Sequence, residues 1–169
     1  GFIFEAVFTR YFNGSDAIAM TKYYEPTRRN SDKWVKEDEI MNNVFILDLN
    51  APSSTVPEKY KLQQATDKDA TQLATLYSKV FEIYPTPLNN PDYIKEVMQQ
   101  GTIFYVILDE TEQIVSAASA EINSVYHNAE LTDCATLPEF RKLGLMKLLL
   151  TKLEEELISS GIYCSYSIA

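Results

Sequence analysis

The sequence predicts an α/β (α+β) protein with a mixed, mostly antiparallel sheet and flanking helices, plus a small α/β segment at the N-terminal end. Two observations lead to this fold class. From residue 60 on, strand-like alternation and helical spacing follow in the order strand, helix, helix, three strands, helix, strand. A single helix joins the third of the three successive strands to the last strand, and such a crossover predicts that these two strands are parallel neighbours.

The N-terminal segment reads as two strands separated by other elements. Its patterns predict, in order, a strand over 2–12, a polar turn over 13–15, a short helix over 16–24, an exposed charged stretch over 25–39 and a strand over 43–49. The stretch APSSTVPEK (51–59) has the Pro and Ser content of a linker. We therefore expect a boundary near Pro57, between an N-terminal segment 1–57 and a domain 58–169.

The domain 58–169 begins with a strand at 60–65 and a helix that Thr66 and Asp69 open as a capping box. The apolar face of that helix carries Ala70, Leu73, Ala74, Tyr77, Val80 and Phe81. Asn90 and Pro91 predict the start of a second helix, and Gly101 predicts its end. The remaining elements are expected to be strands over 102–108, 114–122 and 129–136, an amphipathic helix over 145–161 and a strand over 163–169.

Composition narrows the function classes. A hydrophobic fraction of 46% in 169 residues predicts one core, and no run approaches the roughly 18 apolar residues of a membrane span. With no signal-like start, we expect a cytoplasmic protein. The net charge of -9 argues against nucleic-acid binding, which relies on Lys and Arg side chains that neutralise phosphates. The negative charge favours a small cationic partner, or it serves solubility alone. No metal site is expected, because Cys134 and Cys164 read as buried thiols and the only histidine, His127, as a loop residue. A homodimer is left open.

The segment AELTDCATLPEFRKLGLMKLLL (129–150) runs from a strand through a turn directly into a helix. The unpaired amides and positive dipole end of a helix N-terminus favour an anion such as phosphate. Gly144 would let the backbone approach a diphosphate closely, and Arg141 and Lys142 add positive charge. These residues alone also fit an ordinary amphipathic helix that begins after a turn.

RKLGLM (141–146) resembles the Gln/Arg-x-x-Gly-x-Gly/Ala motif of the GNAT superfamily of acetyltransferases. Arg141 and Gly144 match, whereas Met146 departs from the usual small residue. The resemblance implies the GNAT acyl-CoA N-acyltransferase fold, truncated after its fifth core strand, with acetyl-CoA as co-substrate and the general acid beyond Ala169. The acetyl-CoA contacts that it implies are Cys134, Ala135, Thr136 and Leu137 on the strand edge, and Arg141, Lys142, Leu143, Gly144, Leu145 and Met146 in the loop and helix start.

Glu130 lies eleven residues before Arg141, and the histone-acetyltransferase branch of the superfamily has a general-base glutamate at this offset. A lysine-like amine has a pKa of about 10.4 and must lose a proton before it attacks a thioester. Glu130 can accept that proton, or can bind the cationic amine; both roles stay open. Strand alternation places Asp133 on the opposite face from Glu130, Thr132, Cys134 and Thr136, unless a bulge intervenes.

Several segments together resemble the beta-lysine N-acetyltransferases: FEAVFTRYFNGSDAIAMTKYY, YPTPLNNPDYIKEVM, ASAEI, AELTDCATLPEFRKLGL and GIYCSYSIA. This resemblance implies acetyl transfer to the side-chain amine of L-beta-lysine, giving the osmolyte N6-acetyl-beta-lysine. The residues expected to bind the amine substrate are Tyr84, Glu121, Thr132 and Asp133. The alternatives are another small amine, a polyamine or a protein lysine as acceptor, and an acyl-CoA-binding module without catalysis.

Overall fold

The computed structural model describes residues 1–46 and 56–168. The chain forms two compact units: Gly1–Arg10 with Gly14–Ser53, and Tyr11–Asn13 with Ser54–Ala169. The domain boundary near Pro57 stays a prediction, because much of the linker-like stretch, 51–55, lies outside the described residues. None of the helices in the described ranges has the length and apolar character that crossing a membrane needs.

The first unit contains a two-stranded sheet of β1 (Ile3–Phe12) and β2 (Ser15–Thr21), a 3-10 helix (Pro26–Arg29) and α1 (Trp34–Ile46). The predicted strand over 2–12 and the turn after it are confirmed. The predicted helix over 16–24 is wrong, because half-buried and exposed side chains alternate along β2.

The predicted strand over 43–49 is also wrong where the structure describes it. Residues 43–46 continue α1, since the preceding helix-favouring Lys, Glu and Met residues are followed by no Gly or Pro that would stop the helix. Residues 47–49 lie outside the described ranges.

The second unit is built on a five-stranded sheet with the order β3-β4-β5-β6-β7. Its strands are β3 (Lys61–Gln64), β4 (Ile103–Leu108), β5 (Ile114–Asn123), β6 (Asn128–Thr136) and β7 (Cys164–Tyr166). Neighbours from β3 to β6 are antiparallel, and β7 is parallel to β6. The helices are α2 (Ala70–Val80), α3 (Pro91–Gln99) and α4 (Leu145–Ser159), so the predicted order of elements and the fold class are confirmed.

Local signals in the sequence fix the helix starts. The backbone amide of Thr66 donates to Asp69 Oδ2 at 2.8 Å, which is half of the predicted capping box. Asn90 Oδ1 accepts from the amide of Asp92 at 3.0 Å, with Pro91 as the first residue of α3. Both predicted helix starts are therefore confirmed.

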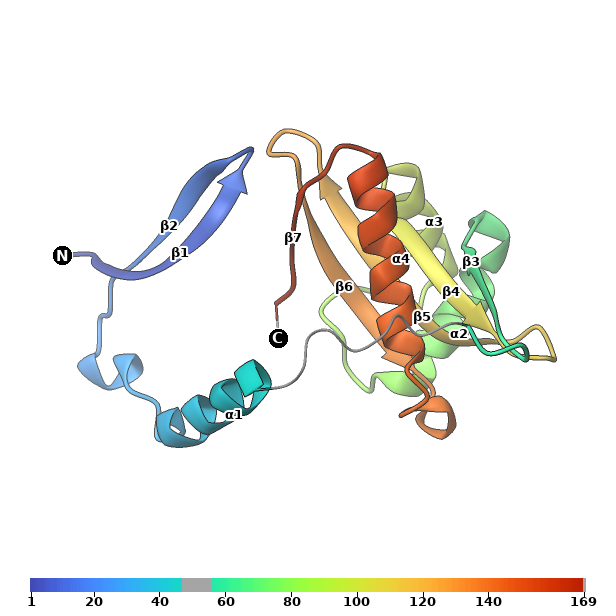
Figure 1. Ribbon diagram of the computed structural model, residues 1–169, viewed down its shortest axis with the longest axis horizontal. Coiled ribbons are helices and arrows are strands. Elements are labelled where there is room, and N and C mark those ends of the chain that lie inside the picture. The colour runs from blue at the N-terminus through green and yellow to red at the C-terminus, as the bar shows by residue number, and fades with distance from the viewer. Residues whose placement is uncertain (47–55, 169) are drawn as a thin grey trace. The chain divides into compact units, whose positions relative to one another are not determined.

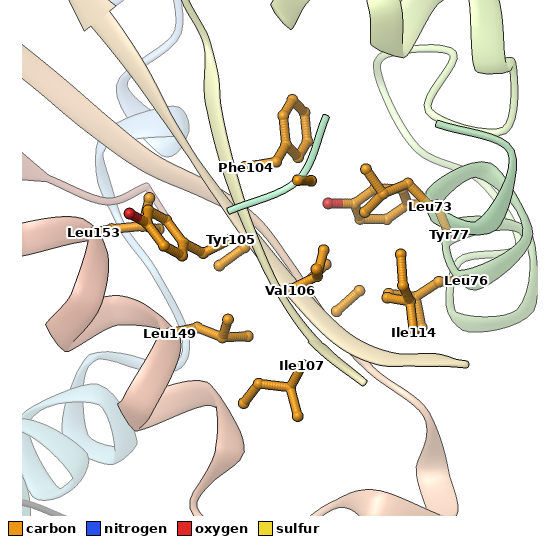
Figure 2. Packing of buried hydrophobic residues seen from close by; sticks show 14 of the residues in the cluster. Leu73, Leu76, Tyr77, Phe104, Tyr105, Val106, Ile107, Ile114, Leu149 and Leu153 are labelled. Carbon is orange, nitrogen blue, oxygen red and sulfur yellow. The ribbon is translucent and has the colours of Figure 1, made fainter. Parts of the chain in front are cut away.

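The helices cover both faces of the sheet, with α4 on one face and α2 and α3 on the other (Figure 1). Along β4, successive side chains point to opposite faces of the sheet (Figure 2). Tyr105 and Ile107 lie toward α4, near Leu149 and Leu153. Phe104 and Val106 lie toward α2, near Leu73 and Tyr77. The core on both sides of the sheet fixes the positions of β5 and β6. The candidate site lies on these two strands.

Candidate active site

A β-bulge interrupts the pairing of β5 with β6. Ala117 lies opposite Ala135, but Ser119 lies opposite Thr132, so Ala118 faces two residues of β6, Asp133 and Cys134. Asp133 adopts a positive φ of 52°, a conformation that Asp tolerates better than most residues. The extra residue reverses the alternation of faces further along β6.

The bulge corrects the predicted distribution of side chains on β6. Cross-strand partners share a face, so Thr132 lies on the face of Ser119 and Thr136 on that of Ser116, which is the opposite one. The Asp133 side chain reaches Ser119, and it therefore lies on the face of Thr132. The predicted separation of Asp133 from Glu130 and Thr132 does not occur.

Three hydroxyl groups hold Asp133. Its carboxylate accepts from Ser119 Oγ at 2.7 Å and from Tyr84 Oη at 3.0 Å, and its carbonyl accepts from Tyr77 Oη at 3.0 Å. Only 6% of Asp133 is exposed. Burial raises the pKa of this carboxyl, while the hydrogen bonds from Ser119 and Tyr84 act to lower it. Asp133 is therefore a fixed and largely desolvated carboxylate beneath the loop that follows α2.

Two further carboxylates lie on the same face. Glu121 and Glu130 are opposite each other on β5 and β6, and they line a cavity of about 350 Å³ with Ile122, Asn123, Ser124 and Tyr166. Partial burial, followed by the charges of Asp133 and Glu130, raises the pKa of Glu121. Because like charges opposite each other on neighbouring strands repel, this arrangement suits a cationic ligand.

The structure thus brings together the residues predicted on the acceptor side. They occupy one face of β5 and β6 and the loop after α2, and they are Tyr84, Glu121, Glu130, Thr132 and Asp133. Ser119 and Tyr77, which link this group, were not identified from the sequence. Ser119 lies in a mainly apolar strand and Tyr77 on the apolar face of α2, so each is expected to serve packing alone. Their hydroxyls find a partner only because the bulge brings Asp133 next to them.

The outer edge of β6 is open beyond Glu130. β7 pairs with β6 only from Asn128 to Glu130, whereas β6 continues to Thr136. Beyond Glu130, no strand in the described part of the chain pairs with the edge of β6 that faces away from β5. The Leu137 amide donates to the Val115 carbonyl at 3.0 Å and so points toward β5. Since successive strand residues direct their backbone groups to opposite edges, those of Thr136 point to the open edge.

The turn before α4 presents unpaired amides. Lys142 and Gly144 have φ angles of 64° and 76°, and Gly144 is the N-cap residue of α4, without a side-chain cap. Within the described residues, the amides from Lys142 to Met146 donate to no protein acceptor, and the first bond of the helix runs from the Leu148 amide to the Gly144 carbonyl at 3.3 Å. A left-handed residue followed by helical ones directs such amides to one side, as in anion-binding nests.

The predicted acetyl-CoA residues differ in what they can offer. The amides of Leu137 and Arg141 are occupied by the carbonyls of Val115 and Pro138, so neither can bind a ligand in this conformation. Arg141 Nε donates to the Thr136 carbonyl at 3.2 Å, which ties the loop to the strand. The side chain of Met146 packs against the core and leaves its amide at the helix start. Cys134 is exposed and Cys164 half-buried, so the prediction of buried thiols is wrong. Cys134 lies on the part of β6 that β7 does not pair with, and Cys164 lies on the edge strand β7.

Asp133 should make the stability of the fold depend on pH. Its folded-state pKa lies above the unfolded value of about 3.9, so the native state binds more protons between these two values. The free energy of unfolding therefore falls as pH rises through this window. Asp133→Asn cannot ionise, and its stability relative to the wild type is expected to increase from pH 4 toward neutral pH in urea titrations.

Asp109 provides a control of opposite sign. Hydrogen bonds from the Thr111 side chain and the Gln113 amide lower the pKa of this exposed carboxyl. The ionised carboxylate therefore stabilises the fold at pH values above its unfolded pKa, and this stabilisation is lost as the pH falls. Asp109→Asn should therefore lose most stability near neutral pH. Parallel pH curves for Asp133→Asn and the wild type would contradict the account of Asp133.

The comparison with known protein families agrees with this fold. Residues 70–168 match the Acetyltransferase (GNAT) family, and the chain belongs to this family. Among solved structures, an aminoglycoside acetyltransferase from an uncultured soil metagenomic sample, in complex with trehalose, superposes with a TM-score of 0.58. It is 20% identical, covers 68% of this chain and 80% of that one, and supports the fold alone.

Two curated relatives are more similar in sequence. N-acetyltransferase YodP of Bacillus subtilis is 37% identical over 159 residues, or 94% of this chain and 57% of that protein. Beta-lysine N(6)-acetyltransferase of Methanococcus maripaludis is 36% identical over 169 residues, or 100% of this chain and 61% of that protein. This chain thus spans about three fifths of the length of these relatives.

Proposed function

We propose that this protein transfers an acetyl group from acetyl-CoA to the side-chain amine of L-beta-lysine, giving N6-acetyl-beta-lysine. The observation that carries the proposal is the position of a carboxylate-lined face on β5 and β6 next to the open edge of β6. The relative named beta-lysine N(6)-acetyltransferase supports the choice of acceptor. An osmolyte role and a cytoplasmic location are part of this proposal and rest on the sequence resemblance.

The chain offers suitable groups for acetyl-CoA. The amides from Lys142 to Met146, with the charges of Arg141 and Lys142, fit a diphosphate. The open edge of β6 beyond Glu130, where the backbone groups of Thr136 point outward, fits an extended amide-containing arm. When bound there, acetyl-CoA supplies the acetyl group as a thioester. The residues described here act on the amine: they bind it and take up the proton that it must lose.

We assign Glu130 as the group that takes the proton from the amine. A protonated amine has no lone pair for attack, so its proton must pass to a base first. Glu130 is half-buried, lines the cavity and is the last residue of β6 that pairs with β7, which places it where the open edge begins. Its carboxylate can therefore accept the proton next to the edge assigned to the thioester.

The other acidic groups suit a substrate with two amines. Glu121 and Asp133 add negative charge on the same face, and Tyr84 and Thr132 add hydroxyls next to Asp133. L-beta-lysine carries two amines and one carboxylate, so two cationic groups can each meet an acidic side chain. A neutral or acidic acceptor would leave these carboxylates without a cationic partner.

An acceptor panel tests the substrate. Full-length protein would be incubated with acetyl-CoA and with L-beta-lysine, L-lysine, spermidine or a lysine-containing peptide, while release of free CoA is followed. We expect the highest kcat/KM for L-beta-lysine, with mass spectrometry locating the acetyl group on the side-chain amine. L-lysine is the matched comparison, because it differs only in the position of one amine. Rapid reaction of another amine without reaction of beta-lysine would overturn the assignment.

A further inference from the structure

The buried carboxylate of Asp133 accepts hydrogen bonds from two hydroxyl groups that have no role in the proton transfer to Glu130. Ser119 is fully buried on β5, and its hydroxyl donates to Asp133 Oδ2 at 2.7 Å. Tyr84 donates to the other oxygen at 3.0 Å. A serine hydroxyl inside an apolar strand is costly unless it is paired, so its pairing with this one carboxylate indicates a role tied to Asp133.

The backbone conformation of Asp133 is also held by its surroundings. Its positive φ of 52° is uncommon for a non-glycine residue, and such conformations persist where the surroundings determine them. Tyr77, only 2% exposed, donates to the carbonyl of the same residue at 3.0 Å. Hydroxyls from α2, from the loop after it and from β5 thus converge on a single residue of β6.

We propose that Ser119 and Tyr84 are positioning residues that keep the Asp133 carboxylate ionised and fixed at the bulge, so that it binds the cationic amine of the acceptor. This inference rests on the proposed function and deepens it. Each oxygen of a carboxylate can accept more than one hydrogen bond, so the two donors leave acceptor sites for an ammonium group. Without these donors, a desolvated carboxylate would more readily take a proton and lose its charge.

The surroundings of Asp133 set the direction of the effect. Burial raises the pKa of Asp133, and the bonds from Ser119 and Tyr84 lower it. The titratable groups that face it are Tyr77 on α2, Tyr84 on the following loop, Glu121 on β5, and Glu130 and Cys134 on β6. None of these groups is cationic, so among the residues that the structure describes no neighbouring positive charge replaces the lost hydrogen bonds.

Two pairs of variants test this role. Ser119→Ala is compared with Ser116→Ala, a fully buried serine of the same strand whose hydroxyl contacts Ala135 and Thr136 rather than Asp133. Tyr84→Phe is compared with Tyr105→Phe, whose hydroxyl donates to the Glu156 carboxylate on the opposite face of the sheet. The controls therefore lose a similar bond at a different place.

The expected result is specific to the amine. Ser119→Ala and Tyr84→Phe should each raise the KM for L-beta-lysine about tenfold, as expected for loss of a hydrogen bond to a charged group. The Kd for acetyl-CoA should stay unchanged. Carboxyl-carbon NMR should show Asp133 titrating at higher pH in both variants than in the wild type, and the acidic limb of kcat/KM should move in the same direction. Neither control should show these shifts.

The outcomes separate the two proposals. If beta-lysine is not acetylated but another amine of the panel is, the substrate assignment fails, and the variants are measured with that amine. If the wild type acetylates an amine and Ser119→Ala behaves like Ser116→Ala in both KM and the Asp133 titration, the role of Ser119 is overturned. If no amine is acetylated or bound, both proposals are overturned.

Discussion

Replacement of Glu130 by glutamine is expected to lower kcat for acetyl transfer by about a hundredfold or more, the contribution typical of a general base. Glutamine has nearly the same shape and keeps a polar group at the cavity, but it cannot take the proton from the amine. The Kd for acetyl-CoA should change by less than about twofold, because Glu130 lies apart from the loop at residues 142–146. Steady-state kinetics and calorimetry measure the two quantities separately.

Glu121→Gln is the matched control for this change. Glu121 lies directly opposite Glu130 and lines the same cavity, so the variant removes an equal charge from the same place. We expect a higher KM for the amine and a smaller effect on kcat, since Glu121 binds rather than accepts the proton. If Glu130→Gln raised KM and left kcat unchanged, Glu130 would be a binding residue and another group would be the base.

The second unit could be predicted because its local and tertiary signals agree. Thr66 with Asp69 and Asn90 with Pro91 mark helix starts that the structure retains, and apolar spacing identifies the strands whose two faces both contact helices. The N-terminal unit gave weaker signals. The helix predicted over 16–24 was wrong, because SDAIAMT has both an alternating pattern and short helix-compatible residues. Pairing with β1 favours the strand over the helix, and the pattern of residues within 15–21 carries no information about that pairing.

The candidate site could be predicted only as a set of residues. The resemblance pointed to Glu130 and to the turn 141–146, and strand alternation then placed Asp133 on the wrong face. A one-residue bulge between Ser119 and Ala117 of β5 caused this error, because it depends on how two strands pair and not on either strand alone. For the same reason Ser119, a serine in an apolar strand, carried no signal before its partner was known.

Gly144→Val is expected to have the opposite effect to Glu130→Gln: it should raise the Kd for acetyl-CoA about tenfold or more and affect kcat at saturation much less. Gly144 has φ 76° at the start of α4, and a β-branched residue is strongly disfavoured there. Valine would turn the chain toward ordinary φ values and redirect the amides from Lys142 to Met146. Since these amides are the groups that fit the diphosphate, the loss should fall on binding.

Gly101→Val separates this effect from general strain. Gly101 follows α3 at a φ of 106°, and among the described residues no atom beyond its two chain neighbours lies within 4 Å of the position that a Cβ would take. Its replacement therefore imposes the same kind of backbone cost without touching the turn before α4. Both variants should lose stability in urea titrations, but only Gly144→Val should weaken acetyl-CoA in calorimetry. Equal affinities for the two variants would mean that the amides at the start of α4 do not hold the diphosphate, and the assignment of acetyl-CoA to this turn would be wrong.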